Sequence, residues 1–338
     1  MKVTPQLTKK RIDLGAQIPL STPLVLYVEA SSFCNLECTF CPHHLDPKNL
    51  NKANMEFSIF KKIIDDLQFF ESDLQMLRMC GTGDPLFNKD LPSMLDYATA
   101  HRKFKKFELI TNGLLINEAK NLEALTSNLS RLIISIEGLS DEDYQKFTNR
   151  NVRFLNFVKK LKKLYERRQG CKIHIKIHNS VVMDMQRREL FFEIFSDICD
   201  EIYIENLVDL WPETDSSYVP KTEHRFDEQE IDKITVCSQI FKTMQINSDG
   251  SVIPCSIDWQ AKNNLGNIKD FSLKELWNGN TIRELRLKHL KGMRFNFSPC
   301  ANCSFNEFSD TDNIDESADS ILKRIDTSQV EKADWVSR

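Results

Sequence analysis

Six short β-rich runs alternate with helical patterns between Leu24 and Val208, and this alternation leaves few folds open to the chain. Between the runs, apolar residues recur at three- and four-residue spacing, which is typical of amphipathic helices. Because parallel strands need helical crossovers, the pattern predicts a parallel sheet wrapped in helices and closed or partly closed into a barrel. Ligands bind at the carboxyl ends of the strands in such barrels, so chemistry is expected in the loops that follow them. The runs cover residues 24–31, 75–81, 105–113, 131–138, 172–182 and 201–208.

The alternation stops near Trp211, where a polar, proline-bearing connector begins. Beyond it, Asp249-Gly250 separates two alternating runs and predicts a β-hairpin. A helical stretch follows over residues 272–292, and the residues from Ser309 onward are acidic and contain no cysteine. We therefore expect a barrel domain over residues 1–215, a smaller second domain over 216–308 and a peripheral C-terminal tail over 309–338.

The charge balance argues against a nucleic acid as partner. Lys and Arg number 45 and Asp and Glu 49, so the net charge is -4 and no basic field covers the whole chain. The first residues lack the apolar core of a secretion signal, and no stretch approaches the ~18 apolar residues that a membrane span needs. We expect a cytoplasmic protein without a membrane partner, whose ten cysteines serve thiol chemistry or metal binding.

Three of these cysteines follow the first β-rich run at C-x3-C-x2-C spacing: Cys34, Cys38 and Cys41. Such a set arises by chance only roughly 0.01 times in a chain of this composition. Three thiolates on one tight loop suit three corners of a cubane iron–sulfur cluster, whose full ligation takes four cysteines. One iron is then left open. The spacing alone also allows a zinc site completed by a remote ligand such as His43 or His44.

Cys34, Cys38 and Cys41, placed after the first strand of a six-fold β-α pattern, resemble the signature of the radical S-adenosylmethionine (SAM) superfamily. With the periodicity, the resemblance predicts an α/β fold: a partial (β/α)6 TIM-like barrel with a small C-terminal α+β iron–sulfur extension. It implies that the amino and carboxylate groups of SAM chelate the open iron of a [4Fe-4S] cluster. In this family an electron from the cluster cleaves SAM to methionine and a 5′-deoxyadenosyl radical, which abstracts a hydrogen atom from the substrate.

Residues in other loops extend the resemblance. Residues 81–85 (G-T-G-D-P) resemble the family's G-G-E-P segment, in which Asp84 replaces the usual Glu as acceptor for the methionyl ammonium. Thr111-Asn112-Gly113 resembles the T-N-G that ends the third strand, and Phe40 stands where relatives carry an aromatic residue against the adenine. Taken alone, these are an ordinary Gly/Pro turn and polar strand ends. The resemblance implies cofactor-binding roles for Phe40, Gly83, Asp84, Pro85, Asn112, Ser135, Glu137 and Asn179.

Four further cysteines form two pairs: Cys237 and Cys255 flank the predicted hairpin, and Cys300 and Cys303 have C-x2-C spacing. Four thiols complete either one tetrahedral zinc site or one cubane. The pattern C-x12-G-x4-C followed by C-x2-C resembles the SPASM/Twitch extension of radical SAM enzymes, which implies auxiliary [4Fe-4S] clusters. The full SPASM pattern continues with more cysteines, but none follows Cys303. We therefore expect one auxiliary cluster, ligated by all four thiols, with a role in electron transfer.

Cys80, Cys171 and Cys199 are left over. Cys171 and Cys199 are most simply small buried hydrophobic residues. Cys80 directly precedes the loop that faces the expected SAM site. If its thiol points into the barrel, Cys80 is a candidate catalytic residue that donates a hydrogen atom to a substrate radical, as a critical cysteine does in radical epimerases. Plain packing is the alternative.

The expected function is that of a radical SAM oxidoreductase of the dehydrogenase or epimerase type, acting on a small polar substrate such as a sugar or an aminocyclitol. A peptide (RiPP) maturase is an alternative, although the 23 residues before Leu24 are too few for the leader-recognition domain that such maturases commonly carry. A non-catalytic zinc-binding scaffold is the alternative from another class. The resemblance also implies a one-electron donor such as flavodoxin or ferredoxin.

Overall fold

The centre of the molecule is one ten-stranded sheet, in the order β1-β7-β6-β5-β4-β3-β2-β8-β9-β10. The computed structural model describes residues 1–4, 12–117, 119–211, 214, 224–225, 230–231, 234–308 and 312–325. The six β-rich runs form six neighbouring parallel strands, which confirms the predicted α/β fold and its partial barrel. These strands are β2 (Val25–Val28), β3 (Leu74–Met79), β4 (Phe104–Thr111), β5 (Arg131–Ile136), β6 (Lys172–His178) and β7 (Glu201–Glu205). A short strand, β1 (Lys2–Val3), pairs with β7.

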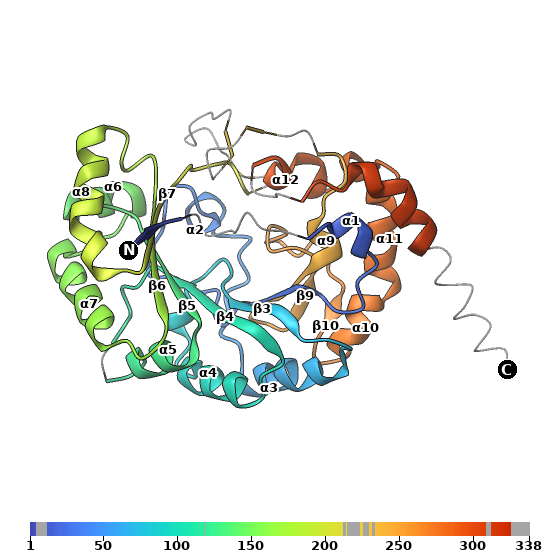
Figure 1. Cartoon of the computed structure of the whole chain (residues 1–338), viewed down its shortest axis with the longest axis horizontal. Helices are drawn as coiled ribbons and strands as arrows, with labels where there is room; N and C mark the ends of the chain where they lie inside the picture. The colour runs from blue at the N-terminus through green and yellow to red at the C-terminus, as the bar shows by residue number, and fades with distance from the viewer. Residues whose placement is uncertain are drawn as a thin grey trace.

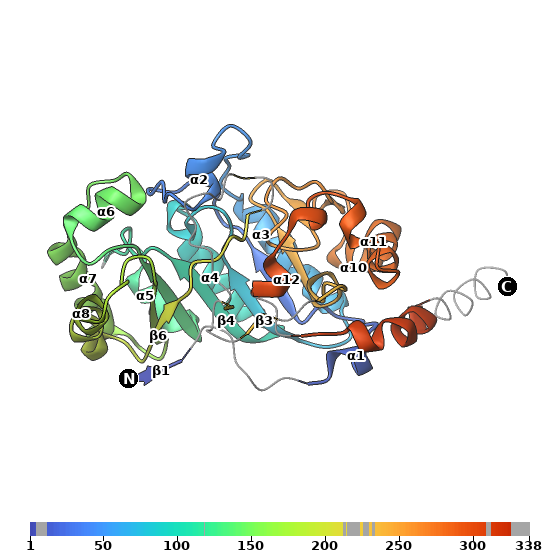
Figure 2. The same ribbon diagram turned by 90° about the horizontal axis from the view of Figure 1, so that it is seen from above.

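Helices cover the outer face of the curved sheet (Figure 1, Figure 2). The predicted helical patterns form α3 (Phe57–Asp66), α4 (Leu91–Ala100), α5 (Leu122–Asn128), α7 (Phe154–Arg167) and α8 (Met185–Phe195). The helix α6 (Asp141–Thr148) was not predicted, although Ser140 caps it: its Oγ accepts a hydrogen bond from the Asp143 amide at 3.1 Å. No helix in the described part of the chain is both long and apolar enough to cross a membrane.

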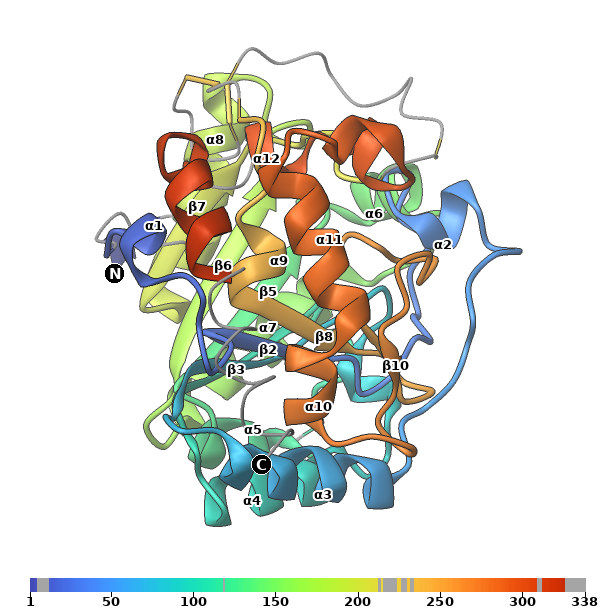
Figure 3. The ribbon, with the colours of Figure 1, turned by 90° about the vertical axis from the view of Figure 1, so that its right-hand side faces the viewer.

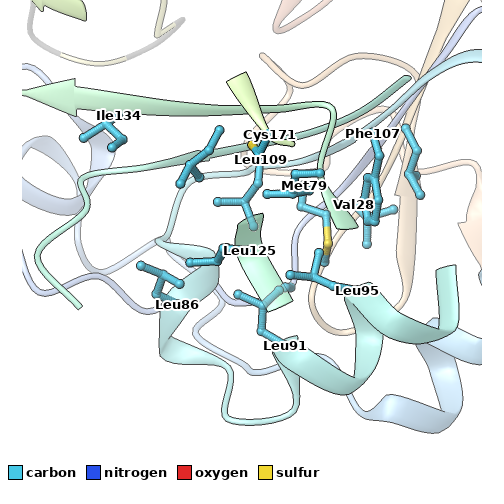
Figure 4. Packing of buried hydrophobic residues seen from close by; sticks show 14 of the residues in the cluster. Val28, Met79, Leu86, Leu91, Leu95, Phe107, Leu109, Leu125, Ile134 and Cys171 are labelled. Carbon is cyan, nitrogen blue, oxygen red and sulfur yellow. The ribbon is translucent and has the colours of Figure 1, made fainter. Parts of the chain in front are cut away.

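Apolar side chains fill the space between the sheet and its helices (Figure 4). On α3, Phe60, Ile63 and Ile64 share the face that packs against the strands. Burying each such side chain contributes about 1.5–3 kcal/mol. Cys171 and Cys199 are 2% and 1% exposed and belong to this core, which confirms their prediction as small buried residues.

The C-terminal extension continues the barrel sheet. The predicted hairpin forms as β8 (Thr243–Ile246) and β9 (Ser251–Ile253), and β10 (Gly266–Asn267) follows. Unexpectedly, β8 pairs in parallel with β2, so the first strand of the barrel has β3 on one side and the extension on the other. The predicted helical stretch is divided at Gly279 into α10 (Leu273–Asn278) and α11 (Asn280–Leu290), which stand beside β8 and β10 in Figure 3.

A second hydrophobic cluster joins the two ends of the chain. Ile18, just after α1 (Leu14–Gln17), packs with Phe241 of α9 (Gln239–Lys242) and with Ile282 of α11. Ile314 and Ile321 are also buried in it, so the described residues 312–325 contribute to a core. The predicted boundary at residues 215 and 216 lies outside the described residues, and the division into domains stays a prediction.

Paired charges line part of the barrel interior. Glu108 of β4 accepts hydrogen bonds from Arg78 Nη2 at 2.5 Å and from Arg131 Nε at 3.0 Å. Glu201 of β7 lies 3.2 Å from Arg131 Nη1 and 3.4 Å from His174 Nδ1. Because buried charges are costly without partners, removing one member of this chain of ion pairs would cost about 3–5 kcal/mol.

His174 makes the stability of this interior depend on pH. Burial, together with the nearby Arg131 cation, lowers the pKa of His174 from 6.5 to about 4. The unfolded chain therefore takes up a proton at a higher pH than the folded chain does, and stability is lost as the pH falls from 6.5 toward 4. We expect His174→Phe to remove on the order of 2 kcal/mol of this pH-dependent loss. Urea unfolding at pH 7 and pH 4.5 measures it, with the exposed His101→Phe as control. An equal loss in parent and His174→Phe would contradict the assignment.

Candidate functional site

Cys34, Cys38 and Cys41 lie together in the loop between β2 and the short helix α2 (Pro42–Leu45). Burial raises the pKa of Cys38 well above its usual range, and Glu137, Cys41 and Cys34 raise it further because their negative charges are close. The unpredicted helix α6 holds this loop. The amides of Glu37 and Thr39 donate to the Thr148 and Phe147 carbonyls at 3.0 and 2.9 Å.

Asp84 ties three loops together at the edge of this site. Its Oδ1 accepts from the Leu86 amide at 2.9 Å, and its Oδ2 accepts from Thr111 Oγ1 at 2.7 Å and from the Asn112 amide at 2.9 Å. The side chain is 3% exposed, and burial raises its pKa. Its carboxylate is therefore engaged in holding the ends of β3 and β4. Pro85 begins the 3-10 turn (Pro85–Phe87) that Asp84 caps.

Gly83 and Glu29 fix the neighbouring loops against each other. A Cβ at Gly83 would lie 2.4 Å from the Ser31 carbonyl oxygen, so only glycine lets this loop approach the segment before Cys34. Glu29, at the end of β2, accepts from Thr82 Oγ1 at 2.7 Å and from Ser248 Oγ at 3.1 Å. The first cysteine loop, the Thr82 loop and the β8–β9 hairpin are thereby joined at one buried carboxylate.

A cavity of about 360 Å³ opens inside the carboxyl end of the barrel. Four of the residues predicted from the sequence line it: Phe40, Cys80, Ser135 and Glu137. The Cys80 thiol, from the end of β3, thus faces the interior of the barrel. Burial raises its pKa to about 11, although the Arg78 cation opposes the rise. At neutral pH Cys80 therefore carries its hydrogen.

Phe40 and Glu137 meet around His178 at one end of this cavity. The Phe40 ring contacts the His178 ring edge-on with centroids 5.0 Å apart, and Glu137 Oε2 lies 3.4 Å from His178 Nε2. Glu137 also raises the pKa values of Cys34 and Cys38, after burial and, at Cys34, after Asp84. This end of the cavity therefore borders the first cysteine loop.

Asn112 and Asn179 do not line the cavity. Asn112 Nδ2 donates to Asn35 Oδ1 at 2.8 Å and lies 3.8 Å from Cys34 Sγ, so this side chain contacts the cysteine loop directly. Asn179 instead donates to Asn206 Oδ1 at 2.9 Å and accepts from the Leu207 amide at 3.0 Å. Asn179 holds the segment after β7, whose residues 206–208 form part of the cavity wall.

The sequence reasoning missed several charged and polar residues of the cavity. Tyr27, Arg78 and Glu205 point inward from three strands, and Glu205 Oε2 lies 2.7 Å from Nζ of Lys176, whose strand was expected to turn one face into the barrel. The available signal was a polar residue within otherwise apolar runs, such as Arg78 in Q-M-L-R-M-C-G. The period of two shows which residues share a face of a strand, but the face that points into a barrel follows only from the closed sheet.

The second set of cysteines surrounds a separate hollow of about 30 Å³ in the extension. Cys237, Cys255, Cys300 and Cys303 all line it, as the sequence predicted. Burial raises the pKa of Cys255 well above its usual range, and the other three thiols add to the rise, Cys237 most. Phe305 lines both this hollow and the barrel cavity. Among the described residues, Phe305 alone lines both spaces, and Ser256, next to Cys255, lines the barrel cavity.

The number of thiol ligands in each cysteine set matches what an iron–sulfur cluster needs. The first supplies three thiols from one loop, and the second supplies four thiols around one hollow, which are the numbers that an open and a fully ligated cubane need. In the wall of the second hollow, the buried ring of His289 and the buried Nε of Arg294 make no hydrogen bond to any other described residue. Among the described residues, no three His, Cys, Asp or Glu side chains gather closely enough to hold a single metal ion.

Asp84→Asn tests whether the buried carboxylate organises this site. In either orientation, the new side-chain amide points its NH2 group at a group that is itself a donor: the Leu86 amide, or the Thr111 hydroxyl and the Asn112 amide. This mismatch should lower the free energy of unfolding by about 1–3 kcal/mol and weaken SAM binding by the reconstituted protein. Urea unfolding and equilibrium dialysis measure the two effects. Asp90→Asn is the matched control, because the Asp90 side chain caps nothing at the start of α4. If the two variants behave alike, Asp84 does not have this role.

Comparison with known proteins agrees with this geometry. The family model "Radical SAM superfamily" matches residues 28–192, and the model "Iron-sulfur cluster-binding domain" (SPASM) matches residues 237–304. The GTP 3′,8-cyclase of Aquifex aeolicus is 31% identical over 140 residues, which cover 39% of this chain and 41% of that protein. This chain therefore spans less than half the length of that relative.

Two solved structures share the fold across most of the chain. The structure of anSMEcpe with bound AdoMet has a TM-score of 0.60 at 17% identity and covers 94% of this chain and 100% of its own. BtrN in complex with AdoMet and 2-DOIA has a TM-score of 0.54 at 17% identity and covers 87% and 95%. Such identities show likeness of fold alone. The two family matches, over residues 28–192 and 237–304, show that the chain belongs to the radical SAM superfamily and carries a C-terminal SPASM iron–sulfur domain, families that imply SAM and [4Fe-4S] clusters as cofactors.

Proposed function

We propose that this radical SAM enzyme generates a 5′-deoxyadenosyl radical, which abstracts hydrogen from a small polar substrate in the barrel cavity. Oxidation or epimerisation then follows, assisted by one auxiliary [4Fe-4S] cluster. The observation that carries the proposal is the continuity of this cavity. It extends from Phe40 and Glu137, beside the first cysteine loop, to Ser256 and Phe305, beside the second cysteine set.

The residues around the first cysteine loop have distinct roles in this proposal. Cys34, Cys38 and Cys41 would hold a cubane with one open iron, and this cluster would supply the binding site for SAM and the electron that SAM cleavage needs. Phe40 packs against the adenine, and Ser135 and Glu137 meet the ribose and the carboxylate. Asp84 positions Asn112 and the Gly83 loop, whose backbone carbonyls accept the methionyl ammonium. Asn179 supports the adenine side indirectly, through Asn206.

The charged part of the cavity favours a polar substrate. Arg78, Lys176 and Glu205 line it together with Tyr27. Hydroxyl and amino groups of a sugar or an aminocyclitol would find both donors and acceptors there. The volume of about 360 Å³ lies within the range of small-molecule sites. The structure of BtrN with 2-DOIA shows a small molecule bound by a neighbour of the same fold.

A peptide substrate is the second candidate. One neighbour of the same fold, anSMEcpe, has been solved with AdoMet and the Cp18Cys peptide. In this chain an apolar wall formed by Leu207, Val208, Leu210 and Trp211 flanks the cavity, and such a surface would also suit a peptide side chain. Assays with free aminocyclitols and with short peptides separate the two candidates.

Electron transfer is the proposed role of the auxiliary site. Oxidation of an alcohol by hydrogen abstraction leaves a carbon radical that must lose one electron and one hydroxyl proton to become a carbonyl. Because all four cysteines line the second hollow, a cubane there has no open iron for the substrate. A flavodoxin or ferredoxin would supply the electron that cleaves SAM. Two zinc sites remain the alternative from another class.

Iron content and SAM cleavage test the two sites separately. The anaerobically reconstituted parent should hold about eight irons per chain and convert SAM to 5′-deoxyadenosine when reduced by dithionite. Cys34→Ala should lose about four irons and all cleavage, whereas Cys300→Ala should lose about four irons and keep cleavage. Inductively coupled plasma spectrometry and chromatography measure the two quantities. Zinc in place of iron at both sites would contradict the proposal.

Cys80 is the proposed hydrogen donor if the reaction is an epimerisation. Its thiol would give a hydrogen atom to the substrate radical, and the sulfur radical left behind would take up one electron from the auxiliary cluster and one proton from solvent to restore the thiol. In deuterated solvent the product of the parent should carry deuterium at the inverted carbon. Cys80→Ala should reduce this incorporation at least tenfold, as mass spectrometry would show. Incorporation at the level of the parent would exclude Cys80 as donor.

A further inference from the structure

The hollow that the four cysteines share has a wall with unused hydrogen-bond donors. Arg294 Nε and the ring nitrogens of His289 are buried and make no hydrogen bond to another described residue. A neutral imidazole carries one N–H, so His289 offers one donor. His289 is fully buried and Arg294 is 2% exposed. Leaving a buried donor unpaired costs about 1–3 kcal/mol. Two such side chains around one small hollow indicate an occupant that accepts hydrogen bonds.

The cysteines limit what that occupant can be. Four thiolates and the sulfides of a cubane are anionic sulfur acceptors, and N–H donors to such sulfurs are known to set cluster potentials. We propose that His289 and Arg294 donate N–H···S hydrogen bonds to the auxiliary [4Fe-4S] cluster and raise its reduction potential. This inference rests on the proposed function, which assigns a cluster to Cys237, Cys255, Cys300 and Cys303.

Arg294 is held in place by its other nitrogen. Its Nη1 donates to the Cys303 carbonyl at 3.1 Å and to Asn306 Oδ1 at 2.9 Å, which leaves Nε directed elsewhere. No carboxylate forms an ion pair with Arg294 in the described part of the chain. The buried guanidinium charge therefore finds its counter-charge in the thiolates. Adding an electron to the cluster strengthens this attraction, which favours the reduced form.

Asp258 is the one acid among the described residues that line the hollow, and it acts in the opposite direction. Its carboxylate accepts from the Lys262 amide at 2.9 Å and from the Asn263 amide at 2.7 Å, and the Asn263 side chain is engaged with the same carboxylate. The negative charge of Asp258 opposes reduction, so the predicted rise in potential has to come from His289 and Arg294.

His289 offers the sharpest test because its side chain has no other hydrogen bond in the described structure. It lies in the last turn of α11, where the Phe297 ring packs against it with centroids 5.5 Å apart. His289→Phe removes the donor and keeps an aromatic ring among aromatic neighbours. His289→Gln restores an N–H donor without the ring. A purely structural role would not distinguish these variants by potential.

Hydrogen bonds from these donors would favour electron transfer from the substrate radical to the auxiliary cluster. A raised potential favours uptake of an electron at the second site over its release. This direction suits oxidation of the substrate radical, in which one electron goes to the auxiliary cluster and one proton leaves the substrate hydroxyl. The residues act as positioning and tuning groups, since none of them lines the barrel cavity.

A redox titration followed by electron paramagnetic resonance (EPR) measures the effect directly. It uses the full chain with Cys34, Cys38 and Cys41 changed to Ala, so that the signal comes from the second site. We expect His289→Phe to lower the ratio of reduced to oxidised cluster about tenfold at the midpoint of this parent, which corresponds to about 59 mV for a one-electron couple. His289→Gln should recover part of the shift. Arg294→Met should shift the midpoint in the same direction, and Arg294→Lys should shift it less.

Arg286→Met is the matched control. Arg286 is a second arginine with buried nitrogens, it lies on the same helix as His289, and it does not line the hollow. Its Nε donates to the Ile240 carbonyl at 2.9 Å. We expect this variant to keep the midpoint of the parent. An equal shift in Arg286→Met and His289→Phe, or no shift in His289→Phe, would overturn the inference.

Two further readouts separate this inference from the proposed function. After exchange into deuterated solvent, pulsed EPR should show deuterium couplings to the cluster that weaken in His289→Phe, and unchanged couplings would count against the hydrogen bond. A second site without iron would overturn the inference as well. SAM cleavage by the unmodified enzyme tests the first site independently, so its failure would leave the potential measurement interpretable.

Discussion

The parallel pairing of β8 with β2 is the constraint on which both proposed sites depend. The first cysteine loop follows the carboxyl end of β2. Because β9 runs antiparallel to β8, Cys255 lies near the start of β8, where Thr243 Oγ1 donates to the Pro254 carbonyl at 3.3 Å, and the pairing of β8 with β2 thus fixes where the second thiol set lies relative to the first. Glu29 links the barrel to the extension, because its two carboxylate oxygens accept hydrogen bonds from Thr82 of a barrel loop and from Ser248 of the β8–β9 hairpin. The extension is thereby a continuation of the barrel, and the cavity reaches from one cysteine set to the other.

The barrel interior contains buried ion pairs where apolar side chains could pack. Arg78, Glu108 and Arg131 are buried and paired, although apolar side chains of similar size would often be as stable or more stable. Their retention places a cation on the cavity wall, next to the Cys80 thiol and the Lys176–Glu205 pair. The second hollow has the same character, since its unpaired nitrogen donors cost stability unless an acceptor occupies it. Both features lower the stability of the fold at positions where we expect ligands to bind.

The sequence alone predicted the repeated and local features well. The six parallel strands followed from periodicity, and the four thiols around one hollow followed from spacing and resemblance. Non-local pairing was not predictable: nothing in residues 243–246 shows that this strand joins β2 and not only its own hairpin partner. The helix α6 was missed because it is short and strongly polar, although its Ser140 cap was a usable signal. The cofactor-binding roles of Asp84 and Asn179 stay predictions, and only the folded arrangement reveals that their side chains also hydrogen-bond to neighbouring loops.

The central claim is that two iron–sulfur sites, of three and four thiols, serve one cavity. The most direct measurement is anomalous diffraction at the iron absorption edge, from crystals grown anaerobically with SAM. The account predicts two iron peaks, one among Cys34, Cys38 and Cys41 and one among Cys237, Cys255, Cys300 and Cys303, with SAM between the first peak and Phe40. Zinc at either site, or SAM bound away from the first cysteine loop, would contradict it.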